Sequence, residues 1–264
     1  MGFLCPTATQ QTTEHEDGKV DRVLEDALGG ESTVRLTVFM PCLNEEMRVA
    51  SALDNVFAAA VHTGTSIEAI VFDDGSTDRT NDAVRAYQKQ HPELSIRLIT
   101  LAANRGLGRN FIDGAFLGKG AYYRAVAGDN YELPEAHEAI MRSLGEADII
   151  IPVYTDVQGR TAFRKSLSGL YTWLVNIVSG NSIGYYNGFP AFRRWHVMRF
   201  AVEATGFGFQ AELVTRLVGE GATYKELVLP ATAQPGSKAL RLRNFVSVGY
   251  SLFRILTRRL SRSW

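Results

Sequence analysis

Short hydrophobic runs alternate with amphipathic segments through the first 150 or so residues of the chain. The runs, which predict strands, cover residues 34–40, 67–72, 94–101, 121–127 and 147–153. The segments between them, which predict helices, cover residues 44–61, 80–90, about 110–117 and a stretch that starts at Pro134. Strands and helices that alternate in this way indicate parallel βαβ units. The pattern therefore predicts an α/β fold with a doubly wound sheet of the nucleotide-binding type.

The second part of the chain has a different pattern. Residues 163–178 are apolar and aromatic and predict a helix, and residues 181–192 are rich in glycine and tyrosine. A helix is predicted over residues 208–219 and a strand over residues 223–229.

The last predicted helix covers residues 244–260. Ser247, Ser251, Arg254 and Arg258 recur in it at helical spacing and form one polar stripe, while the rest is mostly apolar. Two interpretations stay open: the helix packs on the core, or it lies in a membrane interface with its arginines at the headgroups.

Charge divides the chain into three segments, although the net charge is zero. Residues 1–33 contain seven acidic and two basic residues and predict a mobile N-terminal extension. Residues 237–264 contain seven basic residues and no acidic one, which indicates an anionic partner or a solvated tail. We expect an extension over residues 1–33, a folded domain over residues 34–232 and a basic amphipathic segment over residues 233–264.

Several targeting features are missing from the sequence. Cys5 and Cys42 stand far apart and form no disulfide or zinc pattern. The first residues do not resemble a signal peptide, and no apolar run reaches the roughly 18 to 20 residues of a spanning helix. We therefore expect a soluble or peripheral protein in the cytoplasm.

Polar residues follow three of the predicted strands at the points where the strands end. They are P-C-L-N-E at 41–45, D-D-G-S at 73–76 and G-D-N at 128–130. Because the carboxyl ends of parallel strands meet at one edge of the sheet, these groups are expected to share a cleft. The glycine-rich loop N-R-G-L-G-R at 104–109 offers backbone N–H and guanidinium groups that suit phosphate. Carboxylates beside a phosphate indicate ribose, base or cation binding, so the set suggests a nucleotide diphosphate bridged by a metal.

Simpler roles remain open for the same residues. Asp73 and Asp74 also suit a turn. Asp129 also suits a helix N-cap before Pro134. Glu45 also suits the first turn of a helix, where its charge favours the helix dipole.

Six motifs, in order along the chain, resemble those of family 2 glycosyltransferases with the GT-A fold. The resemblance is strongest to polyprenol-phosphate sugar transferases of the dolichol-phosphate mannose synthase type. The motifs are P-C-L-N-E at 41–45, D-D-G-S-T-D at 73–78, N-R-G-L-G at 104–108, N-G-F-P-A-F-R-R at 187–194, G-F-G-F-Q-A-E at 206–212 and G-S-K at 236–238. The resemblance implies a Rossmann-like, mostly parallel sheet flanked by helices, and an inverting transfer from a nucleotide-diphosphate sugar.

The resemblance also implies roles for individual residues. The donor nucleotide would contact Pro41, Leu43, Asn44, Glu45, Asp73, Asp74, Gly75, Asn104, Arg105, Gly106, Gly108 and Gly128. Catalysis would depend on Asp129, Arg164 and Arg194, with Mg²⁺ or Mn²⁺ held by Asp129. The acceptor would contact Ser168, Arg193, Gln210, Glu212 and Lys238.

Two positions depart from the family pattern. The family has Asp-x-Asp at the end of the fourth strand, and here Ala127 replaces the first aspartate. A single carboxylate still permits Mg²⁺ or Mn²⁺, because these ions keep waters and take phosphate oxygens. Asn130, Asp73 or Asp74 is a candidate second ligand. Pro190 stands where the family has an arginine, which removes a phosphate contact.

The choice of acceptor follows from the chemistry of each transfer. Transfer to an alcohol needs a general base, and no residue stands clearly in place for one. A lipid phosphate is already anionic and needs only cations, and Arg164 and Ser168, one helical turn apart, match the pattern of the family's lipid-phosphate site. Residues 170–178 would then cover the prenyl chain, or they form a plain core helix.

We expect an enzyme that uses polyprenyl phosphate at the cytoplasmic face of a membrane and binds no nucleic acid. Two alternatives remain. One is a transferase that acts on a hydroxyl with Glu212 as the base, and the other is a nucleotide-sugar-binding protein with weak catalysis. The sequence leaves the base and the sugar of the donor open.

Overall fold

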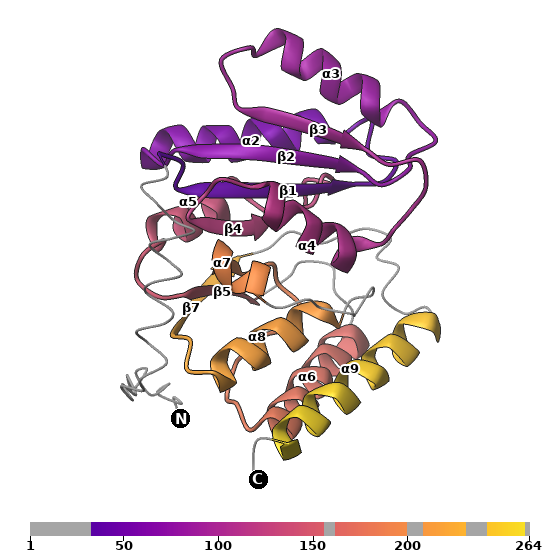
Figure 1. Ribbon diagram of the computed structural model, residues 1–264, viewed down its shortest axis with the longest axis vertical. Coiled ribbons are helices and arrows are strands. Elements are labelled where there is room, and N and C mark those ends of the chain that lie inside the picture. Colours follow the sequence, from indigo (N-terminus) through magenta and orange to yellow (C-terminus); the bar gives the residue numbers. More distant parts are fainter. Residues whose placement is uncertain (1–32, 156–161, 200–207, 231–241, 262–264) are drawn as a thin grey trace. The chain divides into compact units, whose positions relative to one another are not determined.

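The computed structural model describes residues 33–155, 162–199, 208–230 and 242–261, all within the compact unit Glu31–Trp264. Seven strands form one sheet in the order β3-β2-β1-β4-β6-β5-β7, with helices on both faces (Figure 1). The strands are β1 (Leu36–Cys42), β2 (Ile67–Asp73), β3 (Ile96–Thr100), β4 (Tyr122–Ala125), β5 (Ile149–Thr155), β6 (Ala191–Arg193) and β7 (Tyr224–Pro230). The helices are α2 (Val49–Thr63), α3 (Thr80–Gln90), α4 (Leu107–Leu117), α5 (Pro134–Arg142), α6 (Ala162–Ser179), α7 (Arg194–Arg199), α8 (Phe209–Gly219) and α9 (Leu242–Ser261). The predicted α/β class with a mostly parallel sheet is confirmed.

Strand β1 lies inside the sheet and pairs in parallel with both of its neighbours. Leu36 aligns with Ile67 of β2 on one side and with Tyr122 of β4 on the other. Strand β6 is the antiparallel member and connects β4 to β5, with Tyr122 opposite Arg193 and Ile149 opposite Phe192. The sequence pattern did not predict β6, because a three-residue strand is too short to show an alternation of its own.

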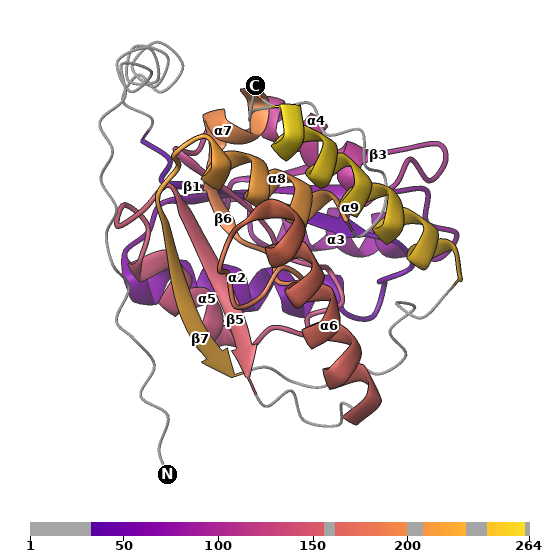
Figure 2. The same ribbon diagram turned by 90° about the horizontal axis from the view of Figure 1, so that it is seen from below.

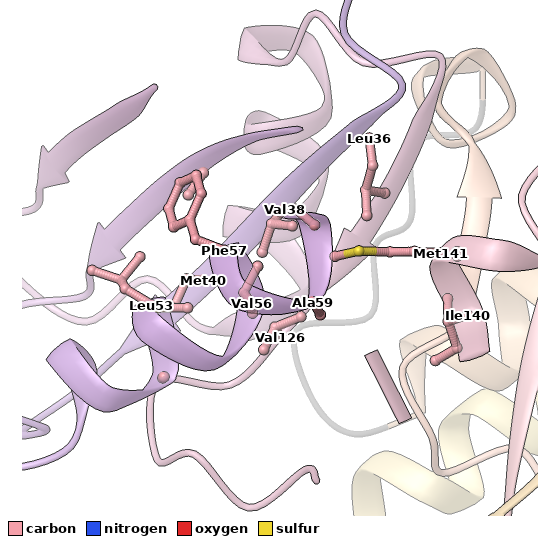
Figure 3. Close-up of a cluster of buried hydrophobic side chains, with 14 of the residues drawn as sticks. Leu36, Val38, Met40, Leu53, Val56, Phe57, Ala59, Val126, Ile140 and Met141 are labelled. Atoms are coloured by element: carbon pink, nitrogen blue, oxygen red, sulfur yellow. The ribbon is translucent and has the colours of Figure 1, made fainter. Parts of the chain in front are cut away.

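Two hydrophobic cores lie on the two faces of the sheet. On one face, Val38 and Met40 of β1 pack with side chains of α2, α3 and α5 (Figure 3). On the other face, Phe39 of β1 packs with Phe111 of α4 and with residues of α6, α7, α8 and α9. Burial on both faces is typical of a parallel sheet and explains why its strands read as continuous apolar runs.

The predicted start of the first helix is wrong by five residues. Helix α2 begins at Val49, and not at residue 44. Asn44 has a φ of 62°, a left-handed conformation that does not continue into an α-helix. The preceding strand is also longer than predicted, since it continues through Pro41 to Cys42. These shifts make residues 43–48 a loop at the carboxyl edge of the sheet.

Helix α9 packs on the core beside α6 and α8 (Figure 2). Ser251 is 1% exposed and Ile255 is 4% exposed, so this side of the helix is buried. Within the described ranges, no helix is both long enough and apolar enough to cross a membrane. The predicted N-terminal extension and residues 233–241 of the predicted C-terminal segment lie outside the described residues.

Candidate active site

The three predicted strand ends meet at one edge of the sheet. The amide of Asp74 donates to the carbonyl of Cys42 at 2.9 Å, and the amide of Gly128 donates to the carbonyl of Pro41 at 3.2 Å. A Cβ atom at Gly128 would lie 2.5 Å from the Cys42 sulfur, so only glycine fits this close approach. The loops after β1, β2 and β4 therefore form one contiguous surface, as the sequence predicts.

Side chains bind the first two loops to each other. The Ser76 hydroxyl accepts from the backbone amide of Asn44 at 3.0 Å, and the side-chain oxygen of Asn44 accepts from the backbone amide of Thr77 at 2.8 Å. The Thr80 hydroxyl accepts from the amide of Glu45 at 2.8 Å. Asn44 thus has a clear structural task in holding the two loops, and its contact with a donor nucleotide stays a prediction.

The two adjacent aspartates of the second motif do different things. Asp73, 2% exposed, accepts from the amide of Ser76 at 2.9 Å. Asp74, 6% exposed, accepts from the amides of Arg105 at 2.8 Å and Gly106 at 3.2 Å, one with each carboxylate oxygen. Asp74 therefore shapes the glycine-rich loop, and its two oxygens are already committed to that loop.

Replacing Asp74 with alanine is expected to lower the free energy of unfolding by about 2 to 3 kcal/mol, because two backbone N–H groups lose a charged acceptor. Urea denaturation measures this loss. Asp113→Ala is the matched control, because that carboxylate, 41% exposed, pairs with the side chain of Arg105 at 2.6 Å and accepts no backbone N–H in the described part of the chain. The control should lose no more than about 1 kcal/mol. Equal losses in the two variants would contradict this role of Asp74.

The glycine-rich loop ends where α4 begins. Gly106 has a φ of 91°, which favours glycine, and Leu107 is the first helical residue. Gly75 comes close to this loop, since a Cβ there would lie 3.0 Å from the backbone of Ala103 and Asn104. The amino end of α4 and the exposed Arg109 thus lie beside the strand ends, in the arrangement that suits phosphate.

Carboxylates gather around Cys42 at the end of β1. Burial raises the pKa of the Cys42 thiol, and the negative charges of Glu45, Asp73, Asp129 and Asp78 raise this pKa further. The edge is therefore electronegative where the motifs converge. An electronegative edge beside a phosphate loop suits a cation between them.

The side chains at this edge of the sheet could hold Mg²⁺ or Mn²⁺ only together with ligands from outside the protein. The described residues contain no group of three His, Cys, Asp or Glu side chains that could hold a metal ion. Asn130 points to α2, where its side chain accepts from Asn55 at 2.8 Å and donates to Ser51 at 3.2 Å. Asp129 is left as the candidate ligand on this loop. A hydrated ion that shares phosphate oxygens suits one carboxylate.

A buried polar network lies behind the loop of Asp129, and the sequence analysis missed it. Arg124 of β4 donates to Glu132 at 2.7 Å, to a ring nitrogen of His137 at 3.1 Å and to the carbonyl of Phe189 at 3.1 Å. The Tyr154 hydroxyl also donates to Glu132. The side chains of Arg124 and Glu132 are each 2% exposed. The network joins the loop after β4, the segment before β6 and strand β5.

His137 is a neutral member of this network. Burial lowers the pKa of His137 to about 4, with the positive charge of Arg124 acting in the same direction and the negative charge of Glu132 opposing it. Arg124 therefore has one anionic partner in the network, Glu132. The sequence contains one signal of this buried network, since Arg124 is a charged residue within the apolar run 121–127.

Ser168, an acceptor candidate on α6, lies near the segment before β6. Ser168 accepts from the side chain of Asn187 at 3.3 Å. Helix α6 includes Arg164, whose side chain lies outside the described residues, as does all of Lys238. Gln210 of α8 is 6% exposed. Ser168 thus contacts the 187–190 segment, and the acceptor roles of these residues stay predictions.

Glu212 is part of an ion-paired cluster. Its side chain is 2% exposed, and one of its oxygens lies 3.0 Å from Arg254 and 2.9 Å from Arg258. Two guanidinium groups stabilise the negative charge of this carboxylate. The arrangement is that of a structural carboxylate that ties α8 to α9, and it offers no support for the predicted role as a general base.

The structure does not bring Arg193 and Arg194 to the carboxyl edge. Arg193 lies opposite Tyr122, the first residue of β4, and stacks on its ring at 4.9 Å. Arg194 donates to the carbonyls of Gly120 at 2.7 Å and Ala115 at 3.2 Å. Because β6 runs antiparallel, its end reaches the amino edge of the sheet. We therefore leave both arginines out of the proposed phosphate site.

The sequence profile of the glycosyl transferase family 2 matches residues 37–206. The chain belongs to glycosyl transferase family 2. The match includes the three strand-end loops, the glycine-rich loop and the segment before β6, so the predicted resemblance and the predicted enzyme class are confirmed. This chain is thus a glycosyltransferase.

Individual relatives agree with this assignment. The chain is 34% identical over 101 residues to a dolichyl-phosphate beta-glucosyltransferase of Dictyostelium discoideum, an alignment that covers 36% of this chain and 31% of that protein. It is 25% identical over 255 residues to the enzyme of the same name from Drosophila melanogaster, covering 88% of this chain and 77% of that one. The first of these alignments therefore spans about a third of its relative, and the second spans about three quarters.

A solved structure shows the same fold. Glucosyl-3-phosphoglycerate synthase from Mycobacterium tuberculosis, in complex with Mn²⁺, uridine diphosphate and phosphoglyceric acid, superposes with a TM-score of 0.65 at 15% sequence identity. The superposition covers 95% of this family 2 glycosyltransferase and 84% of that chain. This likeness confirms the predicted GT-A fold.

Proposed function

We propose that this family 2 glycosyltransferase moves a sugar from a nucleotide-diphosphate sugar to a polyprenyl phosphate, with inversion at the anomeric carbon. The names of the two relatives above support the acceptor class, since both are dolichyl-phosphate beta-glucosyltransferases. The surface formed by the loops after β1, β2 and β4, beside the start of α4, would bind the donor. Asp73, Glu45 and the backbone of Gly75 would contact its nucleoside.

A divalent cation, Mg²⁺ or Mn²⁺, would be held by Asp129 together with the donor diphosphate. When bound, such an ion would stabilise the negative charge that develops on the diphosphate leaving group. Arg105 and Arg109 and the amides at the start of α4 would hold the same phosphates. The complex of the structural neighbour with Mn²⁺ and uridine diphosphate supports this choice of ion.

The environment of Glu212 is the observation that favours a phosphate acceptor over a hydroxyl acceptor. This buried carboxylate was the candidate base for a hydroxyl acceptor, and Arg254 and Arg258 pair with it at 3.0 and 2.9 Å. A polyprenyl phosphate needs no base, because its oxygen is already anionic and attacks the anomeric carbon directly. Ser168 and Arg164 of α6 would hold that phosphate, beside Asn187.

One observation favours an alternative function, the transfer of sugar to a soluble hydroxy acid. The structural neighbour is crystallised with phosphoglyceric acid, a soluble hydroxy acid. A soluble acceptor of that kind would need a base other than Glu212. The likeness to that enzyme is one of fold at 15% identity, whereas the named dolichyl-phosphate enzymes are 34% identical over 101 residues and 25% identical over 255 residues.

A radiolabel assay separates the two functions. The purified full chain is incubated with UDP- and GDP-sugars, with Mg²⁺ or Mn²⁺, and with either dolichyl phosphate or phosphoglycerate. We expect label in a lipid-extractable product, and loss of that product when the ion is chelated. Label only in phosphoglycerate would overturn the proposed acceptor, and no transfer from any donor would favour a sugar-binding protein with weak catalysis.

The location follows from the acceptor. Polyprenyl phosphates reside in bilayers, so the enzyme would work as a peripheral protein, at the cytoplasmic face where nucleotide sugars are present. No nucleic acid takes part in this reaction.

A further inference from the structure

Helices α6 and α9 expose two stripes of large apolar side chains. Half of the fourteen large hydrophobic side chains that are exposed in the described ranges lie on these two helices. The members are 39 to 61% exposed and recur at spacings of three or four residues: Leu170, Trp173 and Ile177 on α6, and Tyr250, Phe253, Leu256 and Leu260 on α9. We call these seven residues the α6–α9 apolar surface. Apolar surface gathered in this way indicates an interaction site.

Polar contacts on the opposite side of α9 fix its orientation. Arg254 and Arg258 point to the buried carboxylate of Glu212 on α8. Ser251, on the same side of α9, is 1% exposed. The polar stripe therefore faces the protein and the apolar stripe faces outward, the reverse of the interpretation that placed these arginines at the headgroups.

Further contacts join α9 to α6. Arg259 donates to the carbonyl of Ile177 at 2.8 Å, and its guanidinium lies close to Gly180, where a Cβ would be 2.9 Å from it. The two helices lie side by side in both views (Figures 1 and 2). The two apolar stripes are thus carried by one packed pair of helices.

The charge of this pair is entirely positive. Helices α6 and α9 contain six basic residues and no aspartate or glutamate: Arg164, Lys165, Arg243, Arg254, Arg258 and Arg259. A cavity of about 180 Å³ opens where α6, α8 and α9 meet. Arg216, Arg258 and Arg259 line it, and two of them are ion-paired, Arg216 with Glu220 at 3.3 Å and Arg258 with Glu212 at 2.9 Å. The excess of basic residues on the helix pair suits an anionic lipid surface.

We propose that the α6–α9 apolar surface docks on an anionic lipid bilayer. The apolar side chains enter the boundary between headgroups and acyl chains, and the net positive charge of the helix pair is attracted to the anionic headgroups. A second copy of this chain fits less well, because it would bring two carboxylate-free, basic helix pairs together. The proposal rests on the proposed function for its purpose, since docking brings the acceptor side of the site to its lipid substrate.

The α6 helix connects the docking surface to the acceptor side. Ser168, which accepts from Asn187, precedes Leu170 by two residues and Trp173 by five. A bilayer that contacts Leu170 and Trp173 is therefore close to the predicted phosphate position. The headgroup of a membrane-embedded polyprenyl phosphate could then reach it while its chain stays in the bilayer.

Vesicle sedimentation tests the proposal. The full chain is mixed with phosphatidylcholine vesicles, with and without one-third phosphatidylglycerol. We expect binding to the anionic vesicles, and at least a tenfold loss of the partition coefficient in Phe253→Glu/Leu260→Glu, whose changed side chains are 61% and 56% exposed. Val61→Glu is the matched control, since Val61 is 78% exposed on α2 and should leave binding unchanged. A wild-type chain that does not bind, or a double variant that binds as well as wild type, would overturn the proposal.

Two further measurements separate docking from catalysis and from self-association. With a short-chain, water-soluble polyprenyl phosphate, the double variant should transfer sugar as fast as wild type; failure of wild type to use any polyprenyl phosphate would reject the proposed function and leave the vesicle result standing. Light scattering gives the oligomeric state. A wild-type dimer that becomes a monomer in the double variant would overturn the docking proposal in favour of a second copy.

Discussion

Replacing Asp129 with alanine is expected to reduce sugar transfer by about 10²- to 10³-fold, the loss seen when one stabilising group is removed from a developing charge. Asp129 is the candidate carboxylate ligand on the loop after β4, where Ala127 removes the family's first aspartate. Little remains in the described part of the chain to replace it, because Asn130 is bound to Asn55 and Ser51 of α2. Initial rates of transfer measure the effect.

The reason for the loss can be tested separately from the rate. Binding of the donor diphosphate should become insensitive to Mn²⁺ in Asp129→Ala, as measured by calorimetry with and without the ion. Glu135→Ala is the control, since this exposed carboxylate lies in the first turn of α5, six residues along. A variant that keeps both its rate and the Mn²⁺ dependence of donor binding would exclude Asp129 as the metal ligand.

Replacing Arg124 with methionine is expected to lower the free energy of unfolding by about 3 to 5 kcal/mol, because Glu132 would keep its charge in the interior without a cationic partner. Both side chains are 2% exposed, and the remaining neighbours of Glu132, which are Tyr154 and the neutral His137, carry no positive charge. For a domain of this size, the midpoint of thermal unfolding should fall by at least about 6 °C. Urea denaturation of the purified variant gives the free energy.

A double variant distinguishes loss of the pair from loss of packing. Arg124→Met/Glu132→Leu removes both charges, and it should recover a large part of the stability that the single variant loses. The exposed pair Arg142 and Glu138, 3.5 Å apart, provides the comparison, and Arg142→Ala should cost no more than about 1 kcal/mol. If the double variant is less stable than Arg124→Met, the loss of stability in the single variant does not come from leaving Glu132 without a cationic partner.

The parallel half of the sheet was predictable because its strands are buried on both faces. Val38, Phe39 and Met40 are all fully buried, so β1 reads as a continuous apolar run. The first helix was misplaced because Asn44 and Glu45 form long-range hydrogen bonds with the loop after β2 and with the first residue of α3. Such contacts with residues more than 30 positions away leave no trace in local periodicity.

The positions of the candidate residues were predictable where these residues follow the ends of strands. Asp73, Asp74, Glu45 and Asp129 all come at the carboxyl edge, which strand order alone implies. Arg194 was assigned a catalytic role through its motif, and the short antiparallel β6 carries it to the other edge. The role of Glu212 also depended on the distant α9, because its partners Arg254 and Arg258 are more than 40 residues away.

The position of β6 has a consequence for how the chain acquires its structure during synthesis. Strands β1, β2, β3 and β4 can pair as soon as they leave the ribosome, because each has a partner earlier in the chain or next to it. Strand β5 pairs only with β6 and β7 among the described strands, and both are made later. Until residue 193 emerges, β4 has an open edge and β5 has no place in the sheet. We expect nascent chains that end between β5 and β6 to be the most prone to aggregate.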